Sequence, residues 1–429
     1  MRPGVTRAAG CSLLAAFTLT SPHALAEAPW DAATELRLRV ESQEGFNKKR
    51  YEPGYSGSRL EERARVQIGW RPHDAVSLFL QGQDAHGLFN DLGPTEFPNG
   101  SPYDNPLDIQ QLWVALQPPG TRLSLKLGRQ VIAFGDDRLL GPGDWSNVGR
   151  YTWDAARLSW QTPTIRGDAF FARRVRRETF EIDHRHYDFD AWGLVSELAS
   201  SPLSIRAYYV FKRGREGDDE RRHSLGVTAN VETDSGLEVA AGVVPQLGTK
   251  ADAGIEALGE YASVGYTFPV EHRPCVRLTQ VYGSGDSRPG EDAIRTFDGV
   301  FGAVAKYYGR MNLFSWMNLH DLGGSVAIEP ARDLAVSLDY HAFFLAQPGD
   351  AWYYANGRAA RSAPPGNMER AVGQEIDLTA KARVSGSWKL QAGCACFAPG
   401  EFVQVTGESS PAHWGFVQGT YSASSVRKE

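Results

Sequence analysis

Apolar and polar residues alternate along short segments of the chain from Thr34 onward. In the first segment, Leu36, Leu38 and Val40 occupy every second position, and charged residues lie between them. Successive side chains of a strand point to opposite faces, so each segment predicts a strand with one apolar and one polar face. The other segments are 63–70, 76–83, 111–117, 123–130, 155–161, 166–176, 189–198, 203–212, 223–231, 236–244, 258–268, 274–282, 333–345, 373–384, 387–397 and 412–421.

The connections between these segments alternate between short and long. Residues 71–74, 118–121 and 200–202 form short turns, whereas 84–110 and 211–222 are long and polar. This asymmetry is typical of outer-membrane barrels, whose periplasmic turns are short and whose outer loops are long. With further strands expected in 297–330, the fold class is all-β: a transmembrane antiparallel β-barrel of about 18 strands with a polar, Arg-rich lumen.

A soluble β-sandwich or propeller would show the same alternation. Two features favour the membrane barrel instead. Charged residues lie in mid-strand on the polar face, which a water-filled lumen tolerates and a packed core does not. Aromatic residues also gather at strand ends, where girdles at the membrane interface are expected. They are Tyr208, Tyr209, Tyr266, Phe268, Tyr307, Tyr308, Trp352, Tyr353, Tyr354, Trp414 and Phe416.

The N-terminus predicts export. Arg2 and Arg7 precede an apolar run, and Ala24-Leu25-Ala26 supplies the small-x-small pattern of a signal peptidase site. The expected organisation is a signal peptide, residues 1–26, followed by one outer-membrane barrel, residues 27–429. The expected location is the cell outer membrane of a Gram-negative bacterium, with outer-membrane lipids and the barrel-assembly machinery as partners. The chain ends in a polar tail rather than on the aromatic residue usual in such barrels.

Composition narrows the remaining classes. The chain is 42% hydrophobic and has a formal net charge of −6, which argues against a helical membrane protein and against nucleic acid as a partner. Cys11 lies in the predicted signal peptide, and the three cysteines expected to remain, Cys275, Cys394 and Cys396, are an odd number that implies no disulfide framework. Cys394 and Cys396 share a strand face and are expected to face lipid.

Neither a metal, a cofactor nor an enzyme activity is expected. The stretches 183–186 and 216–220 lack a third ligand and calcium-loop spacing, respectively. No Gly-x-Ser-x-Gly, His-Glu-x-x-His or phosphate-loop motif occurs. The strand histidines His223 and His341 have no evident catalytic partners in the sequence.

Three ordered blocks of the sequence resemble the alginate export family of outer-membrane barrels. The blocks are Leu127-Gly128-Arg129-Gln130 through Thr152-Trp153-Asp154, then Gly283-Ser284-Gly285-Asp286 through Tyr307-Tyr308-Gly309, then Gly373-Gln374-Glu375 through Phe397-Ala398-Pro399-Gly400. The resemblance implies a monomeric barrel of about eighteen strands. It also implies that an acidic polysaccharide moves outward through an arginine-lined pore, with periplasmic secretion components as a further expected partner.

Strand parity and this resemblance predict residues that line the pore or guide substrate: Arg37, Arg39, Arg63, Arg65, Lys126, Arg129, Arg157, Arg174, Arg176, Arg206, Glu375 and Asp377. Guanidinium groups in a narrow passage attract anions and keep their charge at any physiological pH. The alternative is that these cations only neutralise acids of the lumen such as Glu35, Glu41 and Asp168.

A possible constriction loop contains Asp136, Asp137, Arg138, Asp144 and Arg150. It is expected either to fold into the pore or to form an ordinary network of loop ion pairs. The leading functional prediction is passive passage of an anionic polysaccharide or oligosaccharide, as in alginate-like export. The alternative is a nutrient porin selective for anions or small solutes. A surface adhesin or structural barrel with a plugged lumen is a third class.

Overall fold

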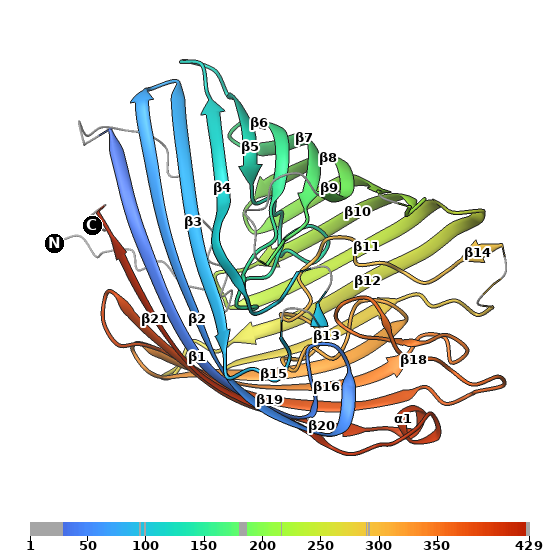
Figure 1. Ribbon diagram of the computed structural model, residues 1–429. Coiled ribbons are helices and arrows are strands. Elements are labelled where there is room, and N and C mark those ends of the chain that lie inside the picture. The colour runs from blue at the N-terminus through green and yellow to red at the C-terminus, as the bar shows by residue number, and fades with distance from the viewer. Residues whose placement is uncertain are drawn as a thin grey trace.

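The computed structural model describes residues 29–425 except 94–95, 98–99, 180–186, 216, 289 and 291. The predicted signal peptide, Cys11 and the stretch 183–186 lie outside the described residues. Eighteen antiparallel strands close into a barrel (Figure 1). They are β1 (Trp30–Phe46), β2 (Tyr51–His73), β3 (Val76–Leu88), β4 (Asn105–Leu116), β5 (Leu123–Gln130), β6 (Trp153–Gln161), β7 (Ile165–Val175), β8 (Tyr187–Ser200), β9 (Leu203–Gly214), β10 (Arg221–Glu232), β11 (Leu237–Lys250), β12 (Ala253–Thr267), β13 (Cys275–Gly283), β15 (Leu319–Ala331), β16 (Leu334–Leu345), β19 (Ala371–Arg383), β20 (Trp388–Pro399) and β21 (Ala412–Ser424).

The remaining elements lie in the long loops. The short strand β14 (Ala293–Ile294) pairs in parallel with the start of β12, and β17 (Trp352–Tyr353) pairs with β18 (Ala359–Arg361). A single turn of helix, α1 (Glu401–Val405), precedes β21. No helix in the described part of the chain is long and apolar enough to cross a membrane.

The first and last strands close the sheet, since β1 pairs with β21 over the register Ala33↔Ser424 to Glu44↔His413. Closure pairs the backbone of both edges, which the hydrocarbon of a membrane requires. Along β1, Leu36 and Leu38 are more than half exposed, whereas Arg37 and Arg39 between them are buried. The apolar face therefore points outward, and the prediction of an antiparallel barrel of about 18 strands is confirmed.

The two ends of the barrel differ. At one end, called the turn end here, residues 74–75, 201–202 and 332–333 suffice to join neighbouring strands. At the other, called the loop end, 131–152 joins β5 to β6 and 295–318 joins β14 to β15. Figure 1 shows these long connections inside the barrel wall. The sequence predicted several strands in 297–330, but only β15 begins there, because residues up to 318 form an inward loop.

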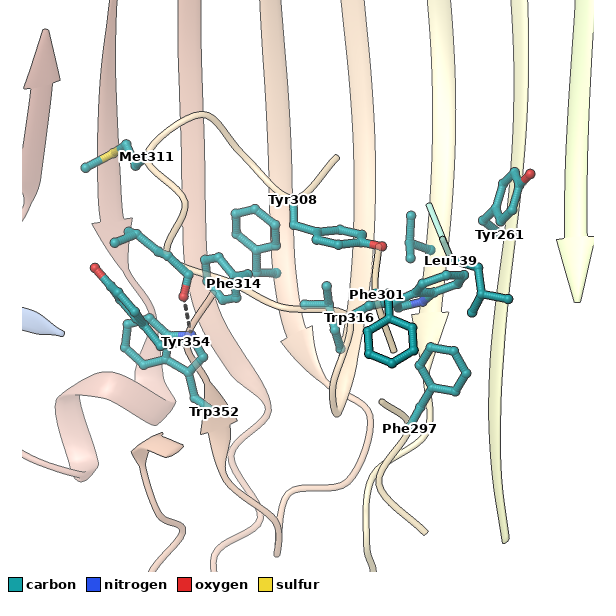
Figure 2. Packing of buried hydrophobic residues seen from close by; sticks show 14 of the residues in the cluster. Leu139, Tyr261, Phe297, Phe301, Tyr308, Met311, Phe314, Trp316, Trp352 and Tyr354 are labelled. Atoms are coloured by element: carbon teal, nitrogen blue, oxygen red, sulfur yellow. Dashed lines mark hydrogen bonds between the residues drawn. The ribbon is translucent and has the colours of Figure 1, made fainter. Parts of the chain in front are cut away.

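The long loops bring a hydrophobic core into the barrel, as Figure 2 shows. Phe314 stacks on Phe343 of β16 with ring centroids 3.8 Å apart, and Phe297 contacts Trp316 at 4.8 Å. The indole nitrogen of Trp352 donates to the Leu313 carbonyl at 3.1 Å. Part of the lumen is thus packed like a protein interior rather than filled with water.

This core corrects part of the predicted aromatic girdle. Tyr308, Trp352, Tyr354 and Trp414 are nearly fully buried and pack inside the barrel instead of at the membrane interface. Phe416 is also buried in this core, and Tyr208 and Tyr307 are partly buried and pack against it. The sequence does not distinguish the two placements, because aromatic residues near strand ends occur both in loops that pack inside a barrel and at membrane interfaces.

Other predicted aromatics do face outward. Tyr266 is 37% exposed and Phe268 is 41% exposed at the turn end. Cys394 and Cys396 are exposed on the outer face opposite Leu378 and Ile376, which confirms their predicted placement.

Candidate channel lumen

Two inward loops, residues 131–152 and 295–318, meet inside the barrel and bind each other through their backbones. Gly141 N–H donates to the Phe301 carbonyl at 3.0 Å, and Phe301 N–H donates to the Leu139 carbonyl at 3.2 Å. Ala303 N–H donates to the Asp137 carbonyl at 2.8 Å. These bonds satisfy backbone groups that would otherwise be buried unpaired, so the two loops form one unit, called the inner loop pair here.

The wall formed by β1 and β2 clamps the first of these loops. Asp144 accepts ion pairs from Arg63 at 3.1 Å and from Arg65 at 2.9 Å. Arg37 donates to the Ser146 carbonyl at 3.0 Å, and the guanidinium of Arg39 lies 4.4 Å from the centre of the Trp145 ring. The predicted pore-lining arginines of this wall therefore hold a loop in place.

These clamping arginines are paired and largely buried. Arg39 is fully buried and pairs with Glu61 and, at 3.2 Å, with Glu41. Arg59, which the sequence analysis did not single out, pairs with the same two acids. Arg59 shares the strand parity of Arg63, and that parity was the signal that could have found it.

The charge of Asp144 is stabilised by its arginines. Burial alone would raise the pKa of this carboxyl, but the positive charges of Arg63 and Arg65 outweigh burial and hold the pKa well below its usual range. We therefore expect Asp144 to remain ionised throughout the physiological pH range.

The second loop is fastened to the opposite side of the lumen. Asp298 pairs with Lys212 of β9 at 2.7 Å, and its carbonyl accepts a bond from Gln246 of β11 at 2.7 Å. Burial raises the pKa of Asp298, yet Lys212 and Arg222 together lower it to about 2. Lys212 and Asp298 were missed from the sequence because they lie 86 positions apart.

Glu375 and Asp377 of β19 also hold this loop. Both carboxylates are fully buried; Glu375 accepts the Met311 N–H at 2.9 Å, and Asp377 accepts the Arg310 N–H at 3.3 Å. The sequence predicted these acids among the pore-lining residues. The structure instead places them beneath the 295–318 loop.

The predicted constriction residues lie in or next to the inner loop pair. Arg138 is buried between the rings of Tyr261 and Tyr307, at 4.1 and 3.8 Å, and pairs with Asp136 at 3.3 Å. Asp137 adopts a positive φ of 69° where the chain turns. Arg150 is partly exposed near the end of its loop. Together with the clamp on Asp144, these contacts show that the 131–152 loop folds into the barrel and that its charged residues form ion pairs.

A third group of predicted cations retains contact with water in the lumen. Arg157 and Arg174 have side chains 21% and 31% exposed, and Arg206 is 12% exposed. Arg157 pairs with Asp168 and Arg206 with Glu197, each at 2.7 Å. Arg157, Arg174 and Arg206 are called the lumen arginines below.

Two further predicted residues lie beside the lumen arginines. Lys126 is partly exposed on β5, and its ammonium lies 4.0 Å from the centre of the Trp113 ring. Arg176, just beyond β7, pairs with Asp188 at 2.9 Å.

A neutral polar ladder lines the neighbouring wall toward the turn end. Gln81 donates to Gln67, and Gln111 donates to Gln81, each at 3.1 Å across strands β2, β3 and β4. All three side chains are partly exposed. Amide groups of this kind can donate to and accept from the hydroxyls of a sugar.

The structure contradicts the prediction for Arg129. It is in register with Leu112 of β4 and shares the outward face with Leu127, whereas Gln130 beside it is buried inside. Arg129 pairs with Asp154 at 2.9 Å on the outer surface. The residue was included because of the family-like block, and its own parity with Leu127 points the other way.

The remaining candidate groups have structural partners. His341 bonds Asp321 at 2.9 Å and His223 bonds Tyr209 at 2.8 Å. In the acidic loop after β9, Glu220 pairs with Arg222 at 2.7 Å. Among the described residues, no group of three or more His, Cys, Asp or Glu side chains is arranged to hold a metal.

The family model for alginate export matches residues 29–416, which is most of the chain. The chain belongs to the alginate export family. No curated protein sequence matches it. Family membership and an outer-membrane barrel fold together identify a passive channel of the Gram-negative outer membrane.

Solved structures share the fold at low identity. Pseudomonas aeruginosa OpdQ superposes with a TM-score of 0.63 at 10% identity, covering 92% of this chain and 98% of OpdQ. The P. aeruginosa outer-membrane protein OpdK gives 0.62 at 11%, with the same coverage. Acinetobacter baumannii OccAB4 gives 0.60 at 9%, covering 93% and 99%. At such identities the likeness of this member of the alginate export family to these proteins concerns fold alone.

Proposed function

We propose that this channel conducts an anionic saccharide, a polyuronate or its oligomers, along the lumen arginines. The observation that carries the proposal is the division of the inner arginines into two groups. Arg37, Arg39 and Arg63 on β1 and β2 are buried and hold the inner loop pair, whereas Arg157, Arg174 and Arg206 remain partly exposed to water. Arg65 is also partly exposed, but Asp144 of the inner loop pair binds its guanidinium. A passing anion would therefore meet Arg157, Arg174 and Arg206.

The chemistry of these side chains suits a polymer with one carboxylate per sugar. Each guanidinium offers a planar fork to a carboxylate and cannot lose its charge. Because Arg157 and Arg206 already pair with Asp168 and Glu197, each would bind a passing carboxylate only weakly. A series of weak, similar sites supports movement, since a single strong site would trap the polymer.

The glutamine ladder supports the saccharide part of the proposal. Gln67, Gln81 and Gln111 present amide groups on the wall adjoining β5, whose Lys126 also faces inward. A chain that carries both carboxylates and hydroxyls would meet cations and amides on adjoining parts of the barrel wall.

A second candidate is a porin for small carboxylates. P. aeruginosa OpdK, which shares this fold, has been crystallised with vanillate. The inner loop pair occupies part of the lumen, and a narrow passage favours small solutes. Both candidates use the lumen arginines and differ in the size of the cargo.

Single-channel recording in a planar bilayer tests the proposal. The current is measured with polyuronate of defined length on one side, and then with a neutral glucan of equal length. A triple variant with Arg157→Gln, Arg174→Gln and Arg206→Gln removes the proposed path. The matched control replaces three arginines of the outer surface, Arg173, Arg213 and Arg221, by Gln, which changes the net charge equally without entering the lumen.

We expect polyuronate to block the current reversibly in the wild type and in the outer control, and to block the lumen triple at least about tenfold more weakly. The neutral glucan should leave the current unchanged. Equal block of the lumen triple and the wild type would contradict the proposal. Block by short carboxylates without block by polyuronate would favour the small-carboxylate porin.

A further inference from the structure

A row of charged residues crosses the outer surface at the loop end of strands β5 to β10. Each member is in direct register with the next on the neighbouring strand, in the order Arg129, Asp154, Arg173, Asp190, Arg213 and Arg221. Directly opposed residues lie about 5 Å apart, so the row is continuous. It is called the outer arginine row here.

The row lies immediately beyond a belt of aromatic residues. Phe171, Trp192, Phe211 and His223 form the adjacent outward row, one step nearer the turn end. Their ring centroids are 5.2, 5.1 and 4.6 Å apart in succession. Aromatic belts lie at the boundary between hydrocarbon and headgroups, which places the arginine row at headgroup level on the loop side of the membrane.

Acids within the row neutralise only part of its charge. Asp154 pairs with Arg129, and Asp190 contacts both Arg173 at 3.6 Å and Arg215 at 3.0 Å. The Arg173 side chain is still 45% exposed. Two acids therefore face four arginines of the row and Arg215 beside it.

Arg213 and Arg221 are the part of the row without an acid partner in the described part of the chain. They lie directly opposite each other on β9 and β10, both are exposed, and neither forms an ion pair within the described part of the chain. Like charges in directly opposed positions destabilise a sheet unless an anion lies between them. The outward strand positions at the loop end of β19, β20, β21 and β1 are Gln374, Ala398, His413 and Glu44, so the row of arginines does not continue on the strands of the far wall.

We propose that the outer arginine row binds the phosphate groups of a lipid in the outer leaflet. A phosphate between Arg213 and Arg221 would accept charge-assisted hydrogen bonds from both, with Arg173 two positions along the row as a further donor. The aromatic belt beneath would contact the upper part of the acyl chains. A lipid is favoured over free phosphate because belt and row lie on one continuous lipid-facing surface. The inference does not depend on the cargo of the channel.

The test measures lipid retained by the purified full-length barrel in mild detergent, using native mass spectrometry. The probes are lipid A with its phosphates and the same lipid after enzymatic dephosphorylation. The variant carries Arg173→Gln, Arg213→Gln and Arg221→Gln, and the control is the lumen triple, which removes the same charge from the opposite face. Inorganic phosphate is added as a competitor in a separate series.

We expect the wild type and the lumen triple to retain phosphorylated lipid A about tenfold more than the dephosphorylated lipid, equivalent to about 1.4 kcal/mol. The outer triple should lose this preference. Equal retention of the two lipids by the wild type would overturn the proposal, and this comparison holds even if the outer triple fails to fold. Full displacement by inorganic phosphate would identify free phosphate as the ligand and also overturn it.

Discussion

The inner-wall arginines differ in what they contact, and burial separates them. Arg37, Arg39 and Arg63 lie under the 131–152 loop and bind its carbonyls or Asp144. Arg157 and Arg174 lie on β6 and β7 and retain exposure to the lumen. The same residue type therefore stabilises a loop on one wall and remains partly exposed to the lumen on another.

Asp144 is the residue on which the clamp depends most. Replacing it by Asn leaves two guanidiniums without their shared carboxylate, although Glu35 still pairs with Arg63 at 2.8 Å. Because Asp144 is about a third exposed, we expect a cost of about 1–3 kcal/mol, less than for a fully buried pair. Single-channel records of Asp144→Asn should show more frequent transitions between current levels. Records identical to the wild type would show that the clamp does not hold the loop.

The acid anchors also predict how the channel responds to pH. Asp144 and Asp298 have folded-state pKa values below the ordinary value, so their stabilising charge is complete above about pH 4 and is lost as the pH falls through the lower folded value. Current noise should stay constant from pH 8 to pH 5 and rise only below about pH 4. A rise near pH 6 or 7 would contradict this expectation and would implicate groups of the barrel wall, namely His341 with Asp321 or the buried acids Glu375 and Asp377.

Gly309 tests the contact between the second loop and β19. A Cβ at this position would lie 2.4 Å from Glu375 Oε1, at a φ of +80°. Gly366 has a φ of +79° and open space around it, so Gly366→Ala carries the same backbone strain without the clash. We expect the Met311 amide to exchange at least about fivefold faster in Gly309→Ala than in Gly366→Ala, measured by hydrogen exchange. Equal exchange rates would mean that the Glu375 side chain moves away from the new methyl group without loosening the loop.

At the scale of elements, the strands could be predicted from the sequence because each barrel strand has two environments. Residues such as Leu36 meet lipid and their neighbours such as Arg37 do not, so alternation alone determines which way a side chain points. The same rule would have placed Arg129 outside. The prediction failed there because the family-like block was given more weight than parity.

The inner loop pair could not be predicted in this way. Its residues do not alternate, and its contacts join positions far apart in the chain, as Leu139 and Phe301 do. Loops without a repeating pattern carry no signal for the surface on which they will pack. Hence Tyr308 and Trp352 resembled girdle residues in the sequence, although both lie inside.

Phe301 tests whether the inner loop pair is a packing unit separate from the barrel. Its ring contacts Trp153 at 4.7 Å and Phe189 at 5.8 Å, and it is nearly fully buried. Phe301→Ala should cost about 3–5 kcal/mol of local packing. We expect faster hydrogen exchange in both loops and little change in the temperature at which the barrel unfolds on a gel.

The matched control for this variant is Phe89→Ala, since Phe89 is 84% exposed in a loop. It should change neither exchange nor unfolding. A fall in the barrel's unfolding temperature as large as the loss of loop protection would show that loops and barrel unfold together.

In the whole molecule, positive charge is concentrated on two surfaces that the net charge of the chain does not reveal. The chain has a formal net charge of −6, yet arginines concentrate on the inner wall and on one outward row. Net charge predicted the absence of a nucleic-acid partner and gave no indication of these two surfaces. These two surfaces can be recognised only from the strand register, which shows which residues of different strands are neighbours.

Passage of an oligosaccharide through the barrel tests the proposed conduction most directly. Liposomes containing the barrel are loaded with a fluorescent oligouronate or with a neutral oligoglucan of equal length, and release is followed over time. We predict that the oligouronate leaves faster than the glucan through the wild type and the outer control, and that this advantage disappears in the lumen triple. If small anions escape while the oligouronate is retained by the wild type, the channel does not conduct anionic saccharides and the account is wrong.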